Sequence, residues 1–323
     1  MTRAFVTGGS GFVGGALVDR LLADGDDVRA LARSTDSAQV LADAGATVAM
    51  GNLFDESALA NAMSDCDVVF HVAGVNTLCP RDAGELYRTN VGGPSAAVQA
   101  AAVAGVTRVV VTSSVAGIGA SPGVVADETT SSSGVFPSHY ARSKNEGERA
   151  ALAAGERLGV EVIAVLPSSV QGPARTEGSA RLFTYAVRKR NPVIINSSVS
   201  IVDIEDCVAG HVAAAELGEP GGRYILSGAT IELRRLVELI ATVTGWERRS
   251  LQVPRWAAAL LGIPAAQLAA WVRSDGPLCP EVVRTMARDH RYDGGRATRE
   301  LGVHYTPIEE TIERVVSAVA GRR

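Results

Sequence analysis

Five of the first fifteen residues are glycines, and they fall within the segment VTGGSGFVGG at positions 6–15. A short apolar run at positions 4–7 overlaps its start, and a helical pattern of apolar residues begins at Phe12. The glycines therefore lie where a strand turns into a helix. In such a turn the backbone can approach a bound phosphate closely.

The spacing of these glycines fits two versions of one motif. Gly9, Gly11 and Gly14 fit G-x-G-x-x-G, whereas Gly8, Gly11 and Gly14 repeat every three residues. Either version places a pyrophosphate at the helix N-terminus, where backbone N–H groups and the helix dipole favour negative charge. The segment predicts a dinucleotide site. The alternative is a tight turn whose glycines only pack the helix against the strand.

Runs of β-branched residues alternate with helical patterns along the first half of the chain. This alternation predicts a parallel sheet with helices on both faces. We expect strands near 3–7, 28–32, 46–50, 67–72, 107–112 and 160–166, and helices near 12–24, 55–63, 82–104 and 138–158.

The alternation becomes irregular after about Pro167. The expected fold class is therefore α/β, a Rossmann doubly wound parallel sheet with a smaller C-terminal α/β substrate lobe. Residues 1–170 would form the dinucleotide-binding domain, and 200–218 would return to it. Residues 171–323 would form mainly the substrate-binding lobe.

Charge and hydropathy limit the classes of binding partner that the chain can have. The chain has 31 basic and 35 acidic residues and no long basic run, so we expect no nucleic-acid binding. No apolar run is long enough for a membrane span, and the chain begins without a signal-peptide pattern. The partner we expect is a small-molecule substrate.

The cysteines also bear on location and on metals. Cys66, Cys79, Cys207 and Cys279 are scattered without Cys-x-x-Cys or Cys/His ligand spacing. We therefore expect neither a disulfide framework nor a metal site, and a reducing, cytoplasmic location.

The end of the second expected strand indicates which dinucleotide binds. NAD sites usually carry an acid about 20 residues past the glycine motif, where it holds the adenosine ribose. Here the strand DVRALAR ends at Arg33, and the nearby acids Asp24, Asp26 and Asp27 come before its apolar residues. A guanidinium suits a 2′-phosphate, which it binds through bidentate, charge-assisted hydrogen bonds. NADP is favoured and NAD is the second choice, with a solvent-facing arginine as the alternative.

A tyrosine and a lysine lie four residues apart in YARSK, so Tyr140 and Lys144 share one face of the expected helix. The chain has only two lysines, Lys144 and Lys189, which makes a chance pairing a poor explanation. Reduction of a carbonyl by a nicotinamide needs a proton on the oxygen. A nearby ammonium favours the phenolate of tyrosine by charge, so the pair suits this proton transfer.

Together these motifs resemble the extended short-chain dehydrogenase/reductases, the NAD-dependent epimerase/dehydratase superfamily. The resemblance covers nearly the whole chain and is strongest to the dihydroflavonol-reductase-like branch. That branch also has 3β-hydroxysteroid-dehydrogenase-like and hopanoid-associated sugar-epimerase-like members. It implies a seven-stranded Rossmann sheet and often a homodimer. The motifs are TGGSGFVG, GNL (51–53), HVAG (71–74), TNV (89–91), TSS (112–114), YARSK (140–144), LPSSVQGP (166–173) and IVDIEDCVAGH (201–211).

The resemblance also implies roles for individual residues. Ser114, Tyr140 and Lys144 would be catalytic, with Ser114 rather than Ser113 holding the reacting oxygen. Position 52 is more often aspartate in relatives, but an asparagine there can still accept from the adenine amino group. The residues expected to contact the dinucleotide are Gly8, Gly11, Phe12, Val13, Gly14, Arg33, Asn52, Leu53, Val72, Ala73, Gly74, Asn90, Thr112, Ser113, Tyr140, Lys144, Pro167, Ser169 and Val170.

Four residues near these motifs have weaker assignments. His139 could shuttle a proton, although it more readily faces a loop because consecutive helix residues point about 100° apart. We expect His71 and His211 to be structural. Asn90 could hold a water or a backbone carbonyl at the site, or simply pack in its helix.

The expected function is NADP(H)-dependent interconversion of an alcohol and a carbonyl on a small to medium, largely apolar substrate. The segments expected around the pocket contain Phe183, Trp256 and Trp271 but few arginines to hold a diphosphate. The alternative is a nucleotide-sugar epimerase or dehydratase with tightly bound NAD(P). A non-catalytic dinucleotide sensor is disfavoured because the serine, tyrosine and lysine are all present.

Overall fold

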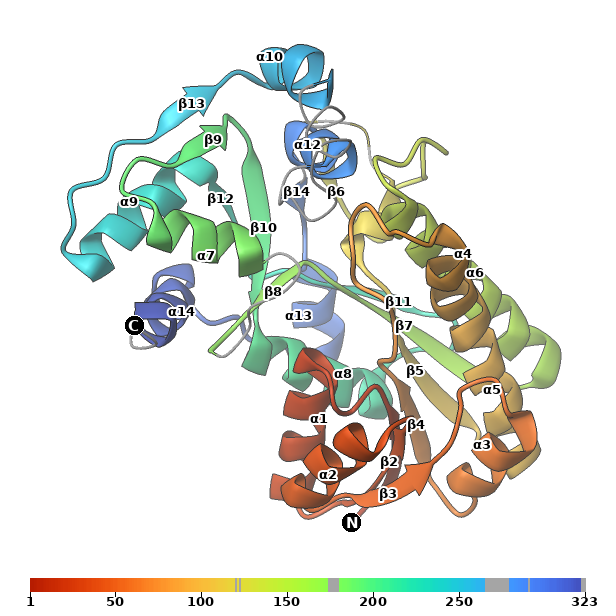
Figure 1. Cartoon of the computed structure of the whole chain (residues 1–323). Helices are drawn as coiled ribbons and strands as arrows, with labels where there is room; N and C mark the ends of the chain where they lie inside the picture. The colour runs from red at the N-terminus through yellow and green to blue at the C-terminus, as the bar shows by residue number, and fades with distance from the viewer. Residues whose placement is uncertain (120, 122, 174–179, 265–278, 290, 321–323) are drawn as a thin grey trace.

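A parallel sheet forms the centre of the molecule. The computed structural model describes residues 1–119, 121, 123–173, 180–264, 279–289 and 291–320. The strands of its main sheet are β1 (Arg3–Thr7), β2 (Asp27–Ala32), β3 (Thr47–Met50), β4 (Val68–His71), β5 (Arg108–Thr112), β7 (Glu161–Pro167) and β11 (Arg223–Leu226). Within the described residues these seven strands are all parallel, in the order β11-β7-β5-β4-β1-β2-β3 (Figure 1).

The direction of winding reverses between β1 and β4. The chain runs outward through β2 and β3 to one edge and then returns to place β4 on the other side of β1. Ligands of such sheets bind outside the carboxyl ends of the strands at this switch point. Thr7 and His71, the last residues of β1 and β4, are aligned neighbours there.

Helices cover both faces of the sheet (Figure 1). One face packs against α1 (Phe12–Ala23), α2 (Thr35–Ala44), α8 (Ile204–Leu217) and α13 (Gly295–Leu301). The other packs against α3 (Glu56–Met63), α5 (Gly93–Ala104) and α6 (His139–Leu158). Burial on both faces explains why the strands are continuous valine-rich runs rather than alternating ones.

Helix α6 has a defined start and end. Its N-cap is Ser138, whose side chain accepts a hydrogen bond from the backbone N–H of Ala141, and it ends at Gly159 with φ +70°. A serine N-cap and a left-handed glycine are the preferred termini of a helix. This start places Tyr140 and Lys144 in the first two turns.

A smaller lobe follows the sheet and has its own apolar core, which includes Phe183, Leu236 and Ile312. Its three-stranded sheet joins β8 (Ser169–Gln171), β10 (Ser198–Asp203) and β12 (Ala229–Glu232). The remaining elements are α4 (Ala83–Tyr87), a π-helical turn (Arg88–Gly92), a 3₁₀ turn (Val115–Ile118), β6 (Val125–Ala126), α7 (Ala180–Arg188), β9 (Val193–Ile195), α9 (Leu233–Thr244), β13 (Leu251–Val253), α10 (Arg255–Ala257), a second π-helical turn (Ala258–Gly262), α12 (Pro280–Ala287), β14 (Arg291–Tyr292) and α14 (Ile308–Ala320).

The expected α/β fold is confirmed, and all six expected strands lie within a residue or two of their predicted positions. The expected helix 82–104 consists of α4, the π-helical turn and α5 in succession. Helix α2 was not expected. Beyond the expected boundary at residue 170, β11 is the edge strand of the main sheet, and α8 and α13 pack against one of its faces. None of the helices in the described ranges is long and apolar enough to cross a membrane.

The expectation that the cysteines form no disulfide is wrong. Cys79 and Cys279 are bonded across 200 residues of sequence, with their Cα atoms 6.4 Å apart. Spacing rules recognise cysteines that are close in sequence, whereas here the fold brings the start of α12 against the segment after β4. Cys66 and Cys207 are present as thiols.

Candidate functional site

The glycine turn between β1 and α1 is too closely packed for side chains. Gly8 has φ +74°, and a Cβ there would lie 2.7 Å from the backbone nitrogen of Ala73. A Cβ on Gly14 would collide with the carbonyl oxygen of Gly8. Gly11 is the N-cap of α1, so no side chain covers this helix end. The turn therefore fits a pyrophosphate, which needs close access to the backbone at a helix N-terminus.

The ends of β1 and β4 are held together by hydrogen bonds. Thr7 Oγ1 lies 3.0 Å from His71 Nδ1 and accepts a hydrogen bond from the Ala73 N–H at 3.3 Å. Burial and, to a smaller extent, the positive charge of Lys144 lower the pKa of His71 to about 3. A neutral, buried His71 suits the structural role expected for it, and Val72 and Ala73 lie beside the glycine turn.

Asn90 fixes the next part of the segment after β4. It lies in the π-helical turn, a distortion often found at functional sites. Its side chain accepts from the Val75 N–H at 2.8 Å and donates to the Val75 carbonyl at 3.0 Å. It also donates to Ser143 Oγ of α6 at 3.0 Å. Asn90 was expected either to hold a water or a backbone carbonyl or to pack in its helix. The structure shows its side chain bonded to the backbone of Val75.

Lys144 connects α6 to the sheet. Its ammonium is buried, 8% exposed, and donates to the carbonyl oxygen of Thr112 at 2.7 Å. A Cβ added to Gly74 would lie 3.7 Å from this ammonium. Burial lowers the pKa of Lys144 to about 8, against the opposing effect of the Glu148 carboxylate. The half-buried Tyr140 lies one turn earlier on the same helix.

The two serines after β5 differ in their surroundings. Ser113 is buried, and its hydroxyl donates to the Glu148 carboxylate at 2.5 Å. Ser114 is half-buried at the start of the 3₁₀ turn, where its hydroxyl accepts from the Ala116 N–H at 3.3 Å. The Ser114 hydroxyl can still donate to another oxygen, so the geometry favours it over Ser113 as the group that meets a substrate.

Glu148 is a site residue that the sequence analysis missed. It is buried, follows Lys144 by four residues on α6, and accepts from Arg223 Nε at 2.6 Å as well as from Ser113. Its place one helical turn after Lys144 was the available signal. Glu148 thus links α6, the end of β5 and the edge strand β11.

Residues expected at the adenosine end gather at the carboxyl ends of β2 and β3. Arg33 and Asn52 are exposed there, and Gly51 donates its N–H to the Ala32 carbonyl at 2.9 Å. The half-buried Leu53 packs with the sheet core.

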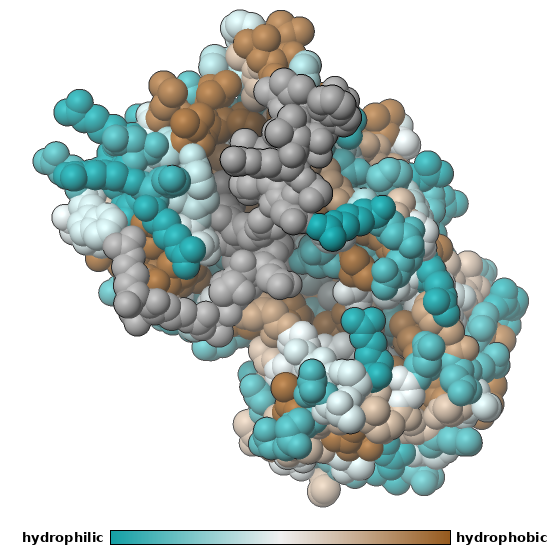
Figure 2. All heavy atoms as spheres, in the orientation of Figure 1, coloured by the Kyte–Doolittle hydropathy of each residue, from teal (hydrophilic) through white to brown (hydrophobic). Residues whose placement is uncertain are grey.

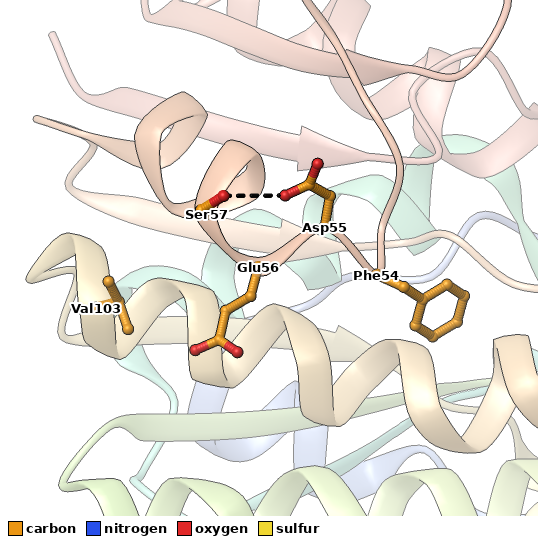
Figure 3. Close-up of a pocket in the computed structure, with 5 residues that line it drawn as sticks. All are labelled: Phe54, Asp55, Glu56, Ser57 and Val103. Carbon is orange, nitrogen blue, oxygen red and sulfur yellow. Dashed lines mark hydrogen bonds between the residues drawn. The ribbon is translucent and has the colours of Figure 1, made fainter.

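An open depression borders the loop after β3 (Figure 3). The Arg88 guanidinium lies 4.4 Å from the centre of the Phe54 ring at its margin. The candidate catalytic residues do not line this depression, so we do not assign the reaction to it. Its lining residues are Phe54, Asp55, Glu56, Ser57 and Val103.

The segment expected to face the nicotinamide runs from Pro167 through β8. Val170 is buried and pairs with Val202 in the lobe sheet, whereas Ser169 accepts from Gln171 Nε2 at 2.8 Å. A Cβ on Gly172 would lie 3.3 Å from the ring of Phe12 at the start of α1. This segment therefore reaches the glycine turn and connects the sheet to the lobe.

Several expected pocket residues lie elsewhere. Phe183 is in the lobe core, and Trp256 is 70% exposed on α10. Figure 2 shows apolar side chains over this part of the surface. The burial of Phe183 and the exposure of Trp256 depend on tertiary packing, which a local sequence pattern does not reveal. Trp271 lies outside the described residues.

Two further histidines, His139 and His211, have other contacts. His139 is exposed, and its Nδ1 lies 3.3 Å from Tyr87 Oη. His211 is buried and bonds the Thr112 side chain at 2.9 Å. Burial lowers its pKa to about 4. His211 thus fixes the end of β5, where the carbonyl oxygen of Thr112 accepts the hydrogen bond from Lys144.

Comparison with known proteins matches the chain to the model of the NAD dependent epimerase/dehydratase family over residues 4–227. A putative dihydroflavonol 4-reductase of Synechocystis is 32% identical over 97% of this chain and 93% of its own. Cinnamoyl-CoA reductase 1 of Oryza sativa is 28% identical over 96% and 88%.

Solved structures agree with these matches. The crystal structure of gox2253 has a TM-score of 0.85 and 27% identity, and covers 100% of this chain and 99% of its own. UDP-glucose 4-epimerase of Thermotoga maritima has a TM-score of 0.78 and 19% identity over 99% of each chain. At that identity the likeness concerns the fold.

Proposed function

Because the chain belongs to the NAD-dependent epimerase/dehydratase family of extended short-chain dehydrogenase/reductases, we propose that it interconverts an alcohol and a carbonyl with NADP(H). The substrate is small to medium and largely apolar. The observation that carries the proposal is the buried Lys144 ammonium, bonded to the Thr112 carbonyl one turn after Tyr140.

Each catalytic residue has one task. A bound nicotinamide dinucleotide supplies or accepts the hydride. Tyr140 Oη gives its proton to the carbonyl oxygen in reduction and takes it back in oxidation. The Lys144 ammonium favours the phenolate by charge, which lowers the cost of losing that proton. Ser114 donates a hydrogen bond to the reacting oxygen and orients it toward Tyr140.

The residues that would hold the dinucleotide lie at the carboxyl ends of the strands, from the switch point between β4 and β1 outward to β3. The glycine turn takes the pyrophosphate at the start of α1, and Val72, Ala73 and Gly74 run beside the nicotinamide ribose. Asn52 and Leu53 hold the adenine. Arg33 binds the 2′-phosphate, because a guanidinium pairs with a phosphate through charge-assisted hydrogen bonds. This arrangement supports NADP rather than NAD.

Redox chemistry is favoured over epimerisation and over dehydration, with one reason for each. The curated relatives cited above are named reductases, and they align over nearly the whole chain. In addition, Glu128, an acid that a dehydratase could use, accepts a hydrogen bond from the Ile225 N–H at 2.8 Å at the sheet edge. Its carboxylate is therefore engaged in holding β11.

A coupled assay tests the function. NADPH absorbance is followed with a panel of apolar ketones, aldehydes and sterol-like substrates, in parallel with product analysis on nucleotide sugars. Loss of NADPH with an apolar carbonyl supports the proposal. A sugar isomer formed at constant absorbance, with cofactor that copurifies, contradicts it.

A further inference from the structure

Glu281, near the start of α12, connects the C-terminal part of the chain to the candidate catalytic site. Its side chain is buried, 6% exposed, and both carboxylate oxygens accept backbone hydrogen bonds. Oε2 accepts from the Cys79 N–H at 2.7 Å, and Oε1 accepts from the His139 N–H at 3.1 Å. One side chain thus joins three parts of the chain that are far apart in sequence.

Both donors adjoin candidate site residues. His139 is the first residue of α6 and directly precedes Tyr140. A first-turn N–H has no partner within its own helix, and the helix dipole favours a carboxylate at this end. Cys79 lies at the far end of the segment that begins with Val72. Glu281 therefore anchors the start of the catalytic helix and the segment expected beside the nicotinamide ribose.

Asn90 connects the same two segments at another point. It holds the backbone of Val75 and the hydroxyl of Ser143 on α6. Asn90 belongs to the dinucleotide-binding layer, so its connection does not depend on the lobe. The Glu281 connection depends on the position of α12. A displacement of α12 would therefore also displace the start of α6, where Tyr140 lies.

The disulfide fixes that position. Cys279 is the N-cap of α12, two residues before Glu281, and it is bonded to Cys79. Cys79 is therefore held twice, by its N–H and by its sulfur. Its φ of +54° is sparsely populated for a residue other than glycine, so the contacts must hold this backbone in place.

We propose that Glu281 is a positioning residue for the catalytic site, and that the Cys79–Cys279 disulfide keeps its carboxylate on the N–H groups of Cys79 and His139. The proposal rests on the oxidoreductase function proposed above. Both cysteines are half-buried, so a small dithiol reaches them. The dithiol gives two electrons and two protons, the S–S bond becomes two thiols, and the dithiol becomes a disulfide.

Kinetics of three variants test the position of the carboxylate. Glu281→Ala should lower kcat for carbonyl reduction about tenfold or more, since misplaced catalytic groups cost rate. Glu281→Gln keeps one acceptor oxygen and should lose less. Glu205→Gln, which removes the charge from an exposed contact to Arg314 on another surface, is the matched control and should keep the wild-type kcat. Affinity for 2′,5′-ADP, which reports only the adenosine end, should stay constant throughout.

Reduction tests the disulfide. Dithiothreitol should lower the wild-type kcat toward the Glu281→Gln value, and reoxidation should restore it. The Cys79→Ser/Cys279→Ser protein should not respond to dithiothreitol. Reduction should add little to Glu281→Ala, because residues acting through one contact are not additive.

Hydrogen exchange separates this proposal from the proposed function. Amides of residues 75–79 and 138–142 should exchange faster in Glu281→Ala and in the reduced wild type. If the wild type reduces no carbonyl, faster exchange still supports the positioning role while the proposed function fails. Unchanged exchange in Glu281→Ala overturns the proposal, and so does a kcat close to that of an active wild type.

Discussion

The ammonium of Lys144 donates a hydrogen bond to the carbonyl oxygen of Thr112 at 2.7 Å. This contact ties the second turn of α6 to the carboxyl end of β5, and His211 holds the Thr112 side chain from the opposite layer. The lysine is therefore fixed at the switch point of the sheet, one turn from Tyr140.

Tyr140→Phe should lower kcat by about 10²–10⁴-fold, because the variant lacks the proton that the substrate oxygen requires. NADPH affinity should stay near the wild-type value, since the ring and its packing remain. Steady-state rates and a fluorescence titration with NADPH measure the two quantities. An active Tyr140→Phe protein would show that another acid, such as His139, gives the proton.

Lys144→Met should damage both turnover and NADPH binding, because the ammonium acts on the tyrosine and on the cofactor ribose. The matched control is Lys189→Met, which changes the other lysine at an exposed position after α7. This control should behave as wild type in both assays. Equal effects of the two substitutions would remove Lys144 from the mechanism.

The pH profile should show the charge of Lys144. Its pKa lies at about 8, lowered by burial, so the ammonium is present below pH 8 and is lost as the pH rises through that value. Activity that needs the charge should fall on the alkaline side. Glu148→Gln removes the carboxylate that raises this pKa, so its alkaline limb should begin at lower pH. An unshifted limb in Glu148→Gln would contradict the assignment.

Ser114→Ala and Ser113→Ala should separate catalysis from stability. Ser114→Ala should lower kcat with little change in the free energy of unfolding. Ser113→Ala removes a hydrogen bond from the buried Glu148 carboxylate, which should cost about 1–3 kcal/mol of unfolding free energy. Urea unfolding and steady-state rates measure both. The reverse pattern would make Ser113 the catalytic hydroxyl.

Arg33→Asp should weaken NADPH binding about 10–100-fold, the loss expected for a charge-assisted contact replaced by repulsion, and should spare NADH. Titration of both cofactors measures the change in preference. Arg299→Asp makes the same charge change on exposed surface of α13 and should leave the preference unaltered. Equal wild-type affinity for NADPH and NADH would remove the role of Arg33.

Acid should destabilise the fold through His71 and His211. Both are buried, and burial lowers the pKa of His71 to about 3 and that of His211 to about 4. Below pH 6.5 these histidines are therefore protonated in the unfolded chain but remain neutral in the folded chain. Stability is then lost as the pH falls, by on the order of 2 kcal/mol for each histidine at pH 5. Urea unfolding at pH 7, 6 and 5 checks this. His211→Asn should flatten the slope, and a wild-type free energy independent of pH would contradict it.

Much of this site could be predicted because its chemistry lies in short local patterns. The glycine turn, the end of β2 and the Tyr140–Lys144 pair are each defined by residues close in sequence. Glu148, Glu281 and the Cys79–Cys279 disulfide could not be assigned in this way, because the fold alone brings their partners together. Phe183 and Trp256 show the same limit, since apolar residues fill a core or stay exposed according to tertiary packing.

The fate of the hydride tests the central claim most directly. NADPH deuterated at the transferred position is incubated with an apolar carbonyl substrate, and NADP⁺ and product are quantified together. The account predicts one NADP⁺ for each alcohol formed, with deuterium on the carbinol carbon and no turnover in Tyr140→Phe. An isomerised product at constant NADPH, with no net oxidation of the cofactor, would contradict it.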